Sequence, residues 1–568
     1  MKRSTHQRHV RRKRNMQRLR YLRRRVERRL GASGRRERAG PVLGGRGGGN
    51  IDYEVAGRAA GVGCGGIGLI HLLGLSVGLA AEIDRELHLL KEHKPYHESD
   101  HVLNLAYNLL AGGSCFEGLE LLRTDGAYLD ALGAERLPDP TTAGDFCRRF
   151  KEADVQGLMG AINRCRLRVW AREAERDRSF LRRAVLDADG AICPTCGACK
   201  RGMDMSYDGQ WSYLAQMVSL ANTKEPLFLV NRSGNRPSHE GVAAYLDLGV
   251  ALCREAGFSS VLLRGDTDFS QTTELDRWDA DRVEFLFGLD AMPNLVEHAR
   301  GLAGSAWREL RRPAKYEVKT QPRARPQDVK EQVVKARGYK NIRLLGESVA
   351  EFDYRPTACD KSYRVVVLRK HLSIEQAKKG KQAKKGKRAK KGKRAKKGER
   401  ARKGERGEEV EREVSEEFRY FFYITNLRLE SAEELVLLAN GRCDQENLIE
   451  QMKNGVKAMR MPTGDLTSNW AYMVIASLAW TLKAWFALTL PAERGPWQKR
   501  HREQKRELLK MEFKRFANAL IRVPCQIVKA GRRVVYRLLS VNAWTSVLLR
   551  AAEHLHRSLP HPRRPLRC

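Results

Sequence analysis

The chain has 568 residues, of which 42% are hydrophobic, and a formal net charge of +38. This length allows several domains, and the apolar content is enough for at least one large core, which excludes a wholly disordered protein. Twelve cysteines are scattered without the dense spacing of a disulfide framework, and the Arg-rich start has no apolar segment typical of a secretory signal. We therefore expect a protein of the reducing cytoplasm.

Most of the positive charge lies in two short segments. Residues 1–48 carry 18 Lys and Arg residues against 2 acidic ones, and residues 377–406 carry 17 against 2. Together they supply +31 of the +38, so the rest of the chain is only weakly basic. The second segment consists of five six-residue copies related to AKKGKR, which cannot form a packed core and predict a solvated linker. A polyanion, nucleic acid first of all, is the expected partner.

In chain order, the first predicted elements are a disordered basic arm and then a set of helices. SDHVLNLAYNLLAG predicts a helix with Ser99 or Asp100 as N-cap, and DPTTAGDFCRRF predicts another that starts at its Pro and Thr residues. Residues 61–81 are uncharged, and the run that starts at Trp470 is strongly apolar. Seven glycines in the first run, and Lys483 inside the second, favour buried helices, so no membrane partner is expected.

From residue 178 the pattern changes to short apolar runs that alternate with helices. Strands are predicted at RRAVLDADG, MSYDGQWSYLAQMVSL, EPLFLVNR, SSVLLRGD and VEFLFGLDA, and helices at SHEGVAAYLDLGVALCREAG and TTELDRWDAD. Three strands followed by alternating helices and strands predict an α/β sheet. Later strands are predicted at SYRVVVLRKH and FRYFFYITNL, and later helices at AEELVLLAN and DQENLIEQMKNGVKAM.

Carboxylates at the ends of two predicted strands are the strongest candidates for chemistry. Asp189 ends RRAVLDADG and Asp266 ends SSVLLRGD, and α/β sheets gather such ends at one edge. Converging carboxylates repel each other unless a cation neutralises them, and two or three acids suit Mg²⁺. The helix DQENLIEQMKNGVKAM adds mixed charge within an arc of about 60°, from Glu446, Glu450, Lys453 and Lys457. The pattern predicts a two-metal phosphoryl-transfer site with basic residues beside it for DNA phosphates.

Two other motifs have the spacing of metal ligands. HESDH matches H-E-x-x-H, which on a helix would bring His97 and His101 to one zinc ion with Glu98 as base, but its polar middle residues favour a capped helix N-terminus. The cysteine run of C-x-x-C-x-x-C spacing has no second pair elsewhere, and the Pro and Gly within it favour a turn. Its members are Cys193, Cys196 and Cys199.

Six segments carry a likeness to a known family: LDADG, GMDMSYDGQWSY, VNRSGNRPSHEG, VLLRGDTDFSQTTELDRWD, FGLDAMPNLVE and RCDQENLIEQMKNGV. They resemble the DDE transposases of bacterial insertion sequences and, within these, the group named IS-thirteen-eighty. The resemblance implies an α/β fold with an RNase-H-like mixed sheet core, interrupted by a β-containing insertion, between an α-helical N-terminal domain and a helical C-terminal region.

The resemblance also assigns roles to single residues. The family's three catalytic acids fall on Asp189, Asp266 and Glu446, which would hold two Mg²⁺ ions, with Mn²⁺ as a substitute. Arg442 and Lys453 keep the spacing of the basic residues in the family's signature and would contact DNA. Asp187 is an alternative first acid, because residues two apart on a strand share a face.

The implied domains follow from these elements. They are a disordered basic arm at 1–50, an α-helical domain at 51–175 that is expected to bind DNA, a first core part at 176–300, an insertion at 301–415 with the repeat at 377–406, a second core part with the Glu helix at 416–490, and a basic helical region at 491–568.

The implied function is Mg²⁺-dependent cleavage of DNA at terminal inverted repeats, followed by transfer of the freed strand into target DNA. The expected assembly is a homodimer on DNA, in a bacterial cytoplasm and associated with the nucleoid. Ala439 stands where related enzymes have tyrosine, and Ala191 where many have threonine. A relative that binds DNA without cutting it is therefore an alternative, as is a zinc metallopeptidase that uses HESDH.

Overall fold

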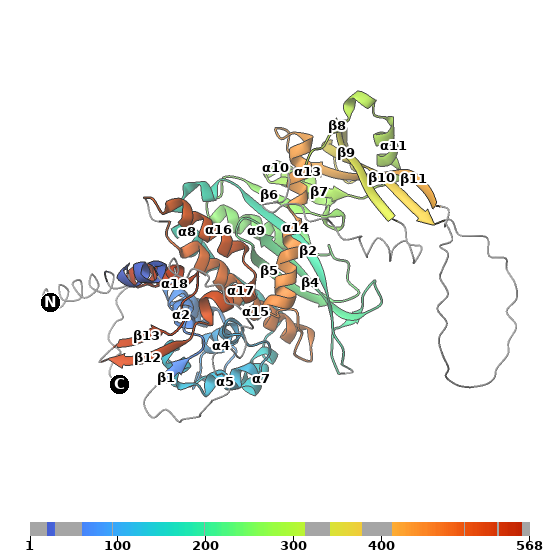
Figure 1. The fold of residues 1–568 in the computed structure, drawn as a ribbon. Coiled ribbons are helices and arrows are strands. Elements are labelled where there is room, and N and C mark those ends of the chain that lie inside the picture. Colours follow the sequence, from blue (N-terminus) through green and yellow to red (C-terminus); the bar gives the residue numbers. More distant parts are fainter. Residues whose placement is uncertain are drawn as a thin grey trace, which may run out of the picture. The chain divides into compact units, whose positions relative to one another are not determined.

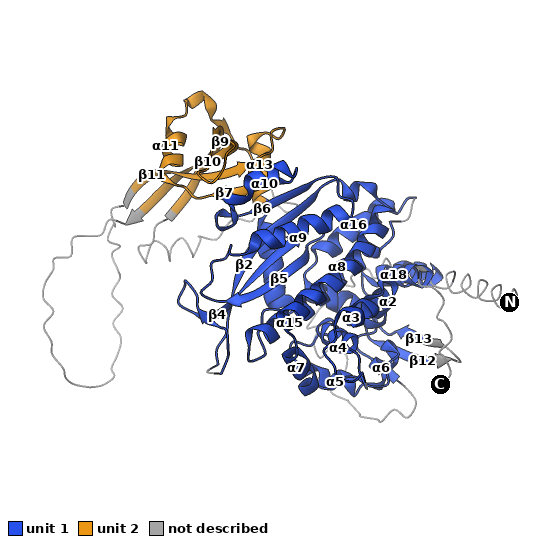
Figure 2. Ribbon diagram, turned by 180° about the vertical axis from the view of Figure 1, so that it is seen from behind, with its two compact units in different colours: residues 1–285, 441–568 blue, residues 286–440 orange. Residues whose placement is uncertain are grey.

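A computed structural model of the chain describes residues 17, 20–28, 60–93, 95–197, 199–312, 341–377, 412–492, 495–530 and 533–558. Contacts divide it into two units, one of residues 1–285 with 441–568 and one of residues 286–440 (Figure 2). The second unit contains the segment 301–415 that was expected as an insertion and extends beyond it at both ends. Apart from Ala377, the lysine-rich repeat lies outside the described residues.

The first unit is built on a mixed β-sheet (Figure 1). Its strands are β2 (Ala184–Pro194), the two-residue β3 (Asp204–Met205), β4 (Trp211–Leu220), β5 (Glu225–Ser233) and β6 (Val261–Gly265). β5, β4 and β2 are antiparallel neighbours in that order, and β6 runs parallel to β2. β6 is buried along its whole length and β4 at all but its first residue, which explains their near-continuous apolar sequences. The predicted strands are confirmed, and their order gives the RNase-H-like core.

Helices cover both faces of this sheet. A Cβ at Gly249 of α9 (Val242–Glu255) would lie 2.9 Å from Leu186 Cδ1 and 3.6 Å from Val218 Cγ1, so α9 packs closely on one face. Ser219 is the next residue along β4 and points to the other face, where its hydroxyl donates to Gln445 of α14 (Cys443–Glu450). The helix predicted to carry the third acid therefore lies against the sheet itself.

The segments before and after the core pack together in the first unit. The N-terminal helices are α2 (Ile67–Val77), α3 (Leu79–Glu86), α4 (Glu98–Ala111), α5 (Gly118–Arg123), α6 (Gly126–Leu132), α7 (Pro140–Arg148) and α8 (Glu152–Ala174), and the C-terminal helices are α15 (Leu466–Thr489), α16 (Gln498–Lys510), α17 (Phe513–Phe516) and α18 (Thr545–Ser558). A small antiparallel sheet joins them, with β12 (Cys525–Ala530) between β1 (Ala60–Val62) and β13 (Arg533–Leu538). The C-terminal region, expected to be helical, thus also contains a β-hairpin.

Two local expectations are wrong. The N-cap of α4 is His97, not Ser99 or Asp100, because Asp100 at the third helical position accepts the His97 backbone N–H at 2.8 Å and so starts the helix earlier. Residues 20–28 of the arm form a helix, in which Val26 is buried and Arg20 Nε lies 3.0 Å from Glu553 Oε1 of α18. Apolar residues four apart give this short segment one packed face.

The two apolar runs form helices of different kinds. The run at 61–81 becomes α2 and α3, which are bent by 61° at the break between them. α15 has the length and composition of a membrane span, but its apolar window is 100% buried inside the protein. Lys483 within it donates from Nζ to the Leu509 carbonyl at 2.9 Å. Burial against other elements therefore accounts for the apolar character of α15.

The described residues of the second unit form an antiparallel sheet and α-helices beside it. Its strand order is β7-β11-β10-β9-β8, and its helices are α11 (Pro293–Gly301) and α13 (Ala432–Asn440). The strands are β7 (Glu284–Leu289), which begins in the first unit, β8 (Arg308–Glu309), β9 (Asn341–Tyr354), β10 (Tyr363–Ala377) and β11 (Arg412–Thr425). Between β6 and β7 the first unit contains the short helix α10 (Leu275–Ala280). The insertion is β-containing, as expected.

One buried carboxylate links three elements of the first unit. Glu225, fully buried in β5, accepts from Arg166 Nε of α8 at 3.0 Å. It also accepts from the indole N–H groups of Trp170 in α8, at 3.0 Å, and of Trp485 in α15, at 2.8 Å. A buried ion pair with directional hydrogen bonds fixes geometry, and loss of one partner leaves an uncompensated charge.

Replacement of Glu225 by Ala should therefore destabilise the first unit by about 3–5 kcal/mol, because the buried Arg166 loses its counter-ion. Urea unfolding followed by tryptophan fluorescence measures the change. Glu240→Ala, which breaks an exposed pair with Arg236, is the matched control and should cost less than about 1 kcal/mol. Equal costs for the two variants would contradict this role for Glu225.

Candidate active site

Strand register brings the first two predicted acids together. Asp187 of β2 is paired with Arg264 of β6 in the parallel ladder, and Asp189 and Asp266 each lie two residues further along. Asp266 follows the end of β6 and caps the short helical turn Thr267–Phe269, where its carboxylate accepts the Asp268 N–H at 3.1 Å. The two carboxylates thus meet at one edge of the sheet.

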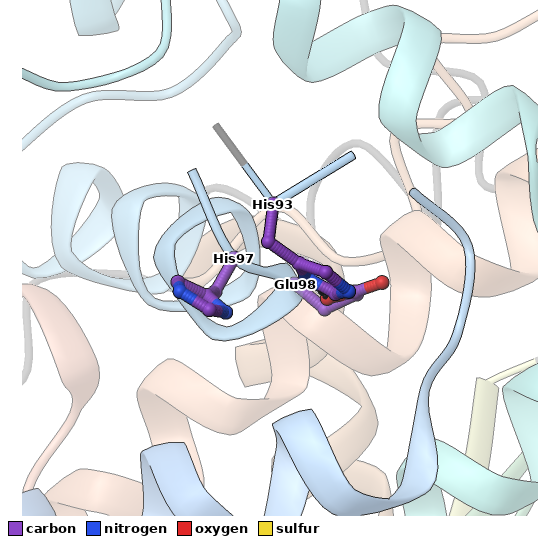
Figure 3. Close-up of side chains that lie close together, drawn as sticks. All are labelled: His93, His97 and Glu98. Carbon is purple, nitrogen blue, oxygen red and sulfur yellow. Dashed lines mark ion pairs between the residues drawn. The ribbon is translucent and has the colours of Figure 1, made fainter. Parts of the chain in front are cut away.

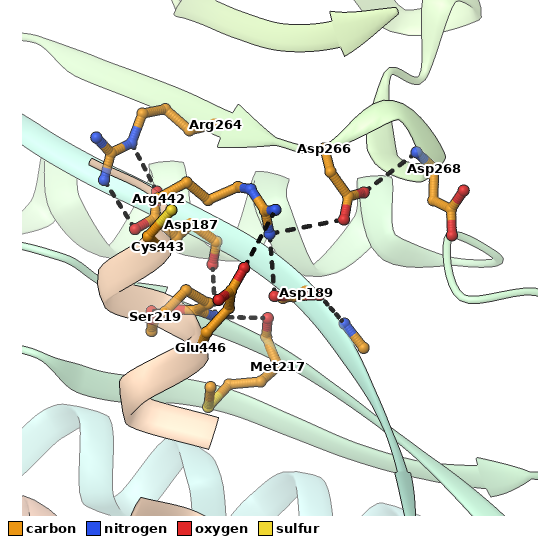
Figure 4. Close-up of polar contacts among 12 residues, drawn as sticks. Asp187, Asp189, Met217, Ser219, Arg264, Asp266, Asp268, Arg442, Cys443 and Glu446 are labelled. Carbon is orange, nitrogen blue, oxygen red and sulfur yellow. Dashed lines mark hydrogen bonds and ion pairs between the residues drawn. The ribbon is translucent and has the colours of Figure 1, made fainter. Parts of the chain in front are cut away.

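A single guanidinium joins all three predicted acids (Figure 4). Arg442 Nη1 lies 3.0 Å from Asp189 Oδ2 and 3.6 Å from Asp266 Oδ2, and Arg442 Nη2 lies 3.9 Å from Glu446 Oε1. Arg442 precedes α14 and Glu446 stands in its first turn, so both come from one helix start. The four residues of the cluster thus come from three segments of the chain: β2, the turn after β6, and the start of α14.

The position of α14 is fixed by a residue that the sequence reasoning missed. Gln445 is 2% exposed, and its side-chain amide donates to the carbonyls of Asp187 at 3.4 Å and Met217 at 3.5 Å. It is adjacent to Glu446 and lies about 100° away around the helix. The sequence offered one signal for this role. On a helix that covers a sheet, the residue next to an exposed acid can face the sheet and anchor the helix to it.

The electrostatics of the cluster favour a cation. The pKa of Asp189 is raised to about 6, mainly by burial and also by the nearby charges of Asp266 and Glu446, against the lowering effect of Arg442. Burial also raises the pKa of Asp266, against the effect of Arg442. The side chains of Asp189, Asp266 and Glu446 are 14%, 35% and 65% exposed, so the cluster is buried on one side and open on the other.

These residues fit a divalent metal ion. Carboxylate oxygens are the preferred ligands of hard cations, and an open side leaves room for water and phosphate oxygens. The raised pKa values of Asp189 and Asp266 show that their negative charges are undercompensated in the protein alone. A divalent cation would offset that charge.

Asp187, the alternative first acid, has a different partner. Its carboxylate is 1% exposed and accepts two hydrogen bonds from Arg264, at 2.7 Å from Nε and 2.8 Å from Nη2. A bidentate pair of this kind occupies the carboxylate fully. The signal for it was an arginine inside the buried apolar strand, since a buried cation needs a partner. Asp189 is therefore the aspartate of β2 that lies with Asp266 and Glu446.

Lys453 does not continue a regular α-helix from Glu446. The helix was expected to run to residue 459, but α14 ends at Glu450 and a π-helical turn, Gln451–Gly455, follows. Lys457 comes after that turn and has a φ of 57°. The wider turn and the left-handed residue break the expected stripe of charge. Lys453 is half-buried and has no ion-pair partner among the residues that the structure describes.

The two other motifs do not form the metal sites that their spacing would allow. Cys193 is buried in β2, with its thiol 3.5 Å from the Ala191 carbonyl, whereas Cys196 and Cys199 are exposed after the strand. In HESDH, His101 turns into the core and stacks on Phe146 at a centroid distance of 4.4 Å. The zinc-peptidase arrangement of His97 and His101 is thus wrong, because one imidazole of the pair is consumed by core packing.

The aspartates at 187 and 189 should respond oppositely to removal of their charge. Asp189→Asn should raise the thermal midpoint by a few degrees at pH 8 in EDTA, since the neutral form is favoured up to a pKa of about 6. The stability that protonation of Asp189 gives is present below pH 4 and lost as the pH rises through 6, so the gain should vanish at pH 4.

Asp187→Asn is the matched control, two residues away on the same strand face. It should lower stability by about 3–5 kcal/mol, because Arg264 is left buried without its carboxylate. Calorimetry of both variants at the two pH values measures the contrast. A stability loss of equal size in both would contradict the assigned environments.

Comparison with known proteins identifies the family. The sequence pattern of the family described as Transposase DDE domain group 1 matches residues 49–379 and 406–560. No curated protein matches the chain. Among solved structures, the chain is similar to the cryo-EM structure of the piggyBac transposase synaptic complex with hairpin DNA, at 9% identity and a TM-score of 0.29, over 87% of this chain and 85% of that one. That likeness is low.

The family match includes the strand that bears Asp189, the turn that bears Asp266 and the helix that bears Glu446. It extends over most of the chain and over both units. The chain therefore belongs to the DDE transposases of domain group 1.

Proposed function

We propose that this chain is an active transposase of the bacterial IS-thirteen-eighty group, which cuts DNA at the terminal inverted repeats of an insertion sequence and joins the freed ends to target DNA. The observation that carries the proposal is the convergence of Asp189, Asp266 and Glu446 on the guanidinium of Arg442. Three acids at one open sheet edge, in a chain of this family, suit phosphoryl transfer.

Asp189, Asp266 and Glu446 would hold two Mg²⁺ ions, or Mn²⁺ in their place. Bound divalent ions supply a lowered pKa for an attacking water or 3′-hydroxyl and neutralise the leaving oxygen. Asp189 and Asp266 must lose their protons to serve as ligands. Their raised pKa values shift this loss to higher pH. Glu446 is the most exposed of the three, and its side chain has the freedom to complete the ligand set last.

Arg442 and Lys453 would contact DNA phosphates beside the cut. Arg442 lies among the acids and is 19% exposed, so it is near enough to hold a scissile phosphate as the carboxylates take their ions. Lys453 lies in the π-helical turn that follows α14 and lacks an ion pair with any described residue, which leaves its charge available. The predicted assembly is a homodimer on DNA in the bacterial cytoplasm, at the nucleoid.

Glu446→Gln should reduce cleavage of a duplex that carries the element's end by more than about 100-fold in Mg²⁺, because loss of a ligand costs more than loss of a residue that only supports one. DNA binding should be kept, because the exposed side chain makes no packing contact that the fold needs. A gel assay of nicked product, with and without EDTA, measures the change.

Glu450→Gln is the matched control, one helical turn away on the same face, and should cleave like the natural protein. Cleavage by Glu446→Gln at the natural rate would overturn the assignment of this acid. DNA binding by the natural protein without any nick in Mg²⁺ or Mn²⁺ would instead support a relative that binds DNA and does not cut it.

Lys453→Ala should weaken binding to DNA of any sequence and lower the salt dependence of the binding constant by about one unit of slope, as loss of one phosphate contact predicts. Fluorescence anisotropy over a range of salt concentrations, on an element end and on an unrelated duplex, measures both. An unchanged slope would remove Lys453 from the DNA contacts.

A further inference from the structure

A second group of metal-ligating side chains lies outside the carboxylate cluster (Figure 3). His93, in the loop after α3, and His97 and Glu98, at the start of α4, bring one ligand atom each to within 4.8 Å of one another. The two imidazoles are stacked, with centroids 5.0 Å apart and ring planes at 26°. None of these side chains takes part in the proposed phosphoryl transfer.

Glu98 is the anchor of this group. It is fully buried, and its Oε1 accepts the backbone N–H groups of Leu89 at 2.9 Å and Leu90 at 3.0 Å. Its Oε2 is also buried but has no hydrogen-bond partner among the described residues. A buried carboxylate oxygen needs a compensating positive charge, which either a protonated His93, at ion-pair distance, or a bound metal ion would supply.

The open oxygen is aimed at the histidines. Glu98 Oε2 lies 3.3 Å from His93 Nδ1. Two ligand atoms bound to the same tetrahedral zinc ion at normal bond lengths lie about 3.3 Å apart, so this pair is already spaced as ligands. His97 is exposed, and its ligand atom lies within 4.8 Å of those of His93 and Glu98.

The donor set selects the type of ion. Two imidazole nitrogens and one carboxylate oxygen suit zinc and similar divalent transition metals, whereas Mg²⁺ and Ca²⁺ prefer oxygen ligands throughout. With three protein ligands, a water would fill the fourth position. His101, the second histidine of the H-E-x-x-H spacing, is excluded by its stacking on Phe146.

We propose that His93, His97 and Glu98 bind one zinc-class ion, which ties the loop between α3 and α4 to the first turn of α4. The bound ion would be ligated by Oε2 of Glu98 and would link this residue to His93 and His97. Because α4 packs against α15, α3 and α7, the ion stabilises the start of a helix that the first unit buries.

The test uses the full chain without a histidine tag, stripped with a chelator and titrated with ZnCl₂ by calorimetry. With the carboxylate cluster filled by excess Mg²⁺, one zinc per chain should bind, and the double variant His93→Ala/His97→Ala should weaken this binding by more than about 100-fold. His88→Ala, an exposed histidine in the same loop, and Glu446→Gln, a change in the carboxylate cluster, should both leave it unchanged. Zinc should also raise the thermal midpoint of the natural protein but not of the double variant.

Two further measurements keep the result interpretable. Both histidines are exposed, so the double variant should match the natural protein in circular dichroism and thermal midpoint without metal. Cobalt(II) in the site should absorb as a nitrogen and oxygen complex, without a thiolate charge-transfer band. The proposal is overturned if the natural protein binds no zinc, if the double variant binds as tightly as the natural protein, or if binding is lost only in Cys196→Ala/Cys199→Ala.

Discussion

The fold of the first unit depends on one buried carboxylate. Glu225 of β5 receives a guanidinium and an indole from α8 and a second indole from α15, so a single side chain ties the central sheet to helices before and after it in the sequence. The interaction is directional and lies in a low-dielectric interior, where an unpaired charge is far more costly than a paired one is favourable. It therefore selects one arrangement of α8, β5 and α15, and the sheet edge with the acids belongs to the unit so fixed.

The active site adds a second constraint, which is repulsion. Three carboxylates share a half-buried edge, and within the described part of the chain Arg442 is their common counter-charge. Burial and mutual repulsion raise the pKa of Asp189, so the site is poised to accept more positive charge. Two devices hold the acids in place against this repulsion: the parallel pairing of β2 with β6, and the buried amide of Gln445, which fastens α14 to the sheet.

Much of the architecture could be predicted from the sequence because its signals are local. The near-continuous apolar runs of β4 and β6 predict buried strands, and Asp139 before Pro140 predicts the start of α7, where Asp139 does accept the Thr142 N–H at 2.9 Å. Strand ends in an α/β sheet converge by topology, so Asp189 and Asp266 could be paired in advance. Boundaries were less predictable. The α-helix with Glu446 ends at Glu450, where a π-helical turn begins, and this end could not be predicted because such a turn has no distinct pattern of residues.

The sequence by itself determined the family, the order of strands and helices in the core, and the three candidate acids, because hydrophobic periodicity and motif spacing are properties of neighbouring residues. Only the tertiary structure showed that Asp187 pairs with Arg264, 77 residues away, while Asp189 lies with Asp266 and Glu446, because both aspartates belong to the same face of one strand. It likewise decided that the HESDH motif places His101 in the core and joins His93 to Glu98 instead. Side-chain partners across the fold are set by packing and charge in three dimensions, which spacing along the chain does not encode.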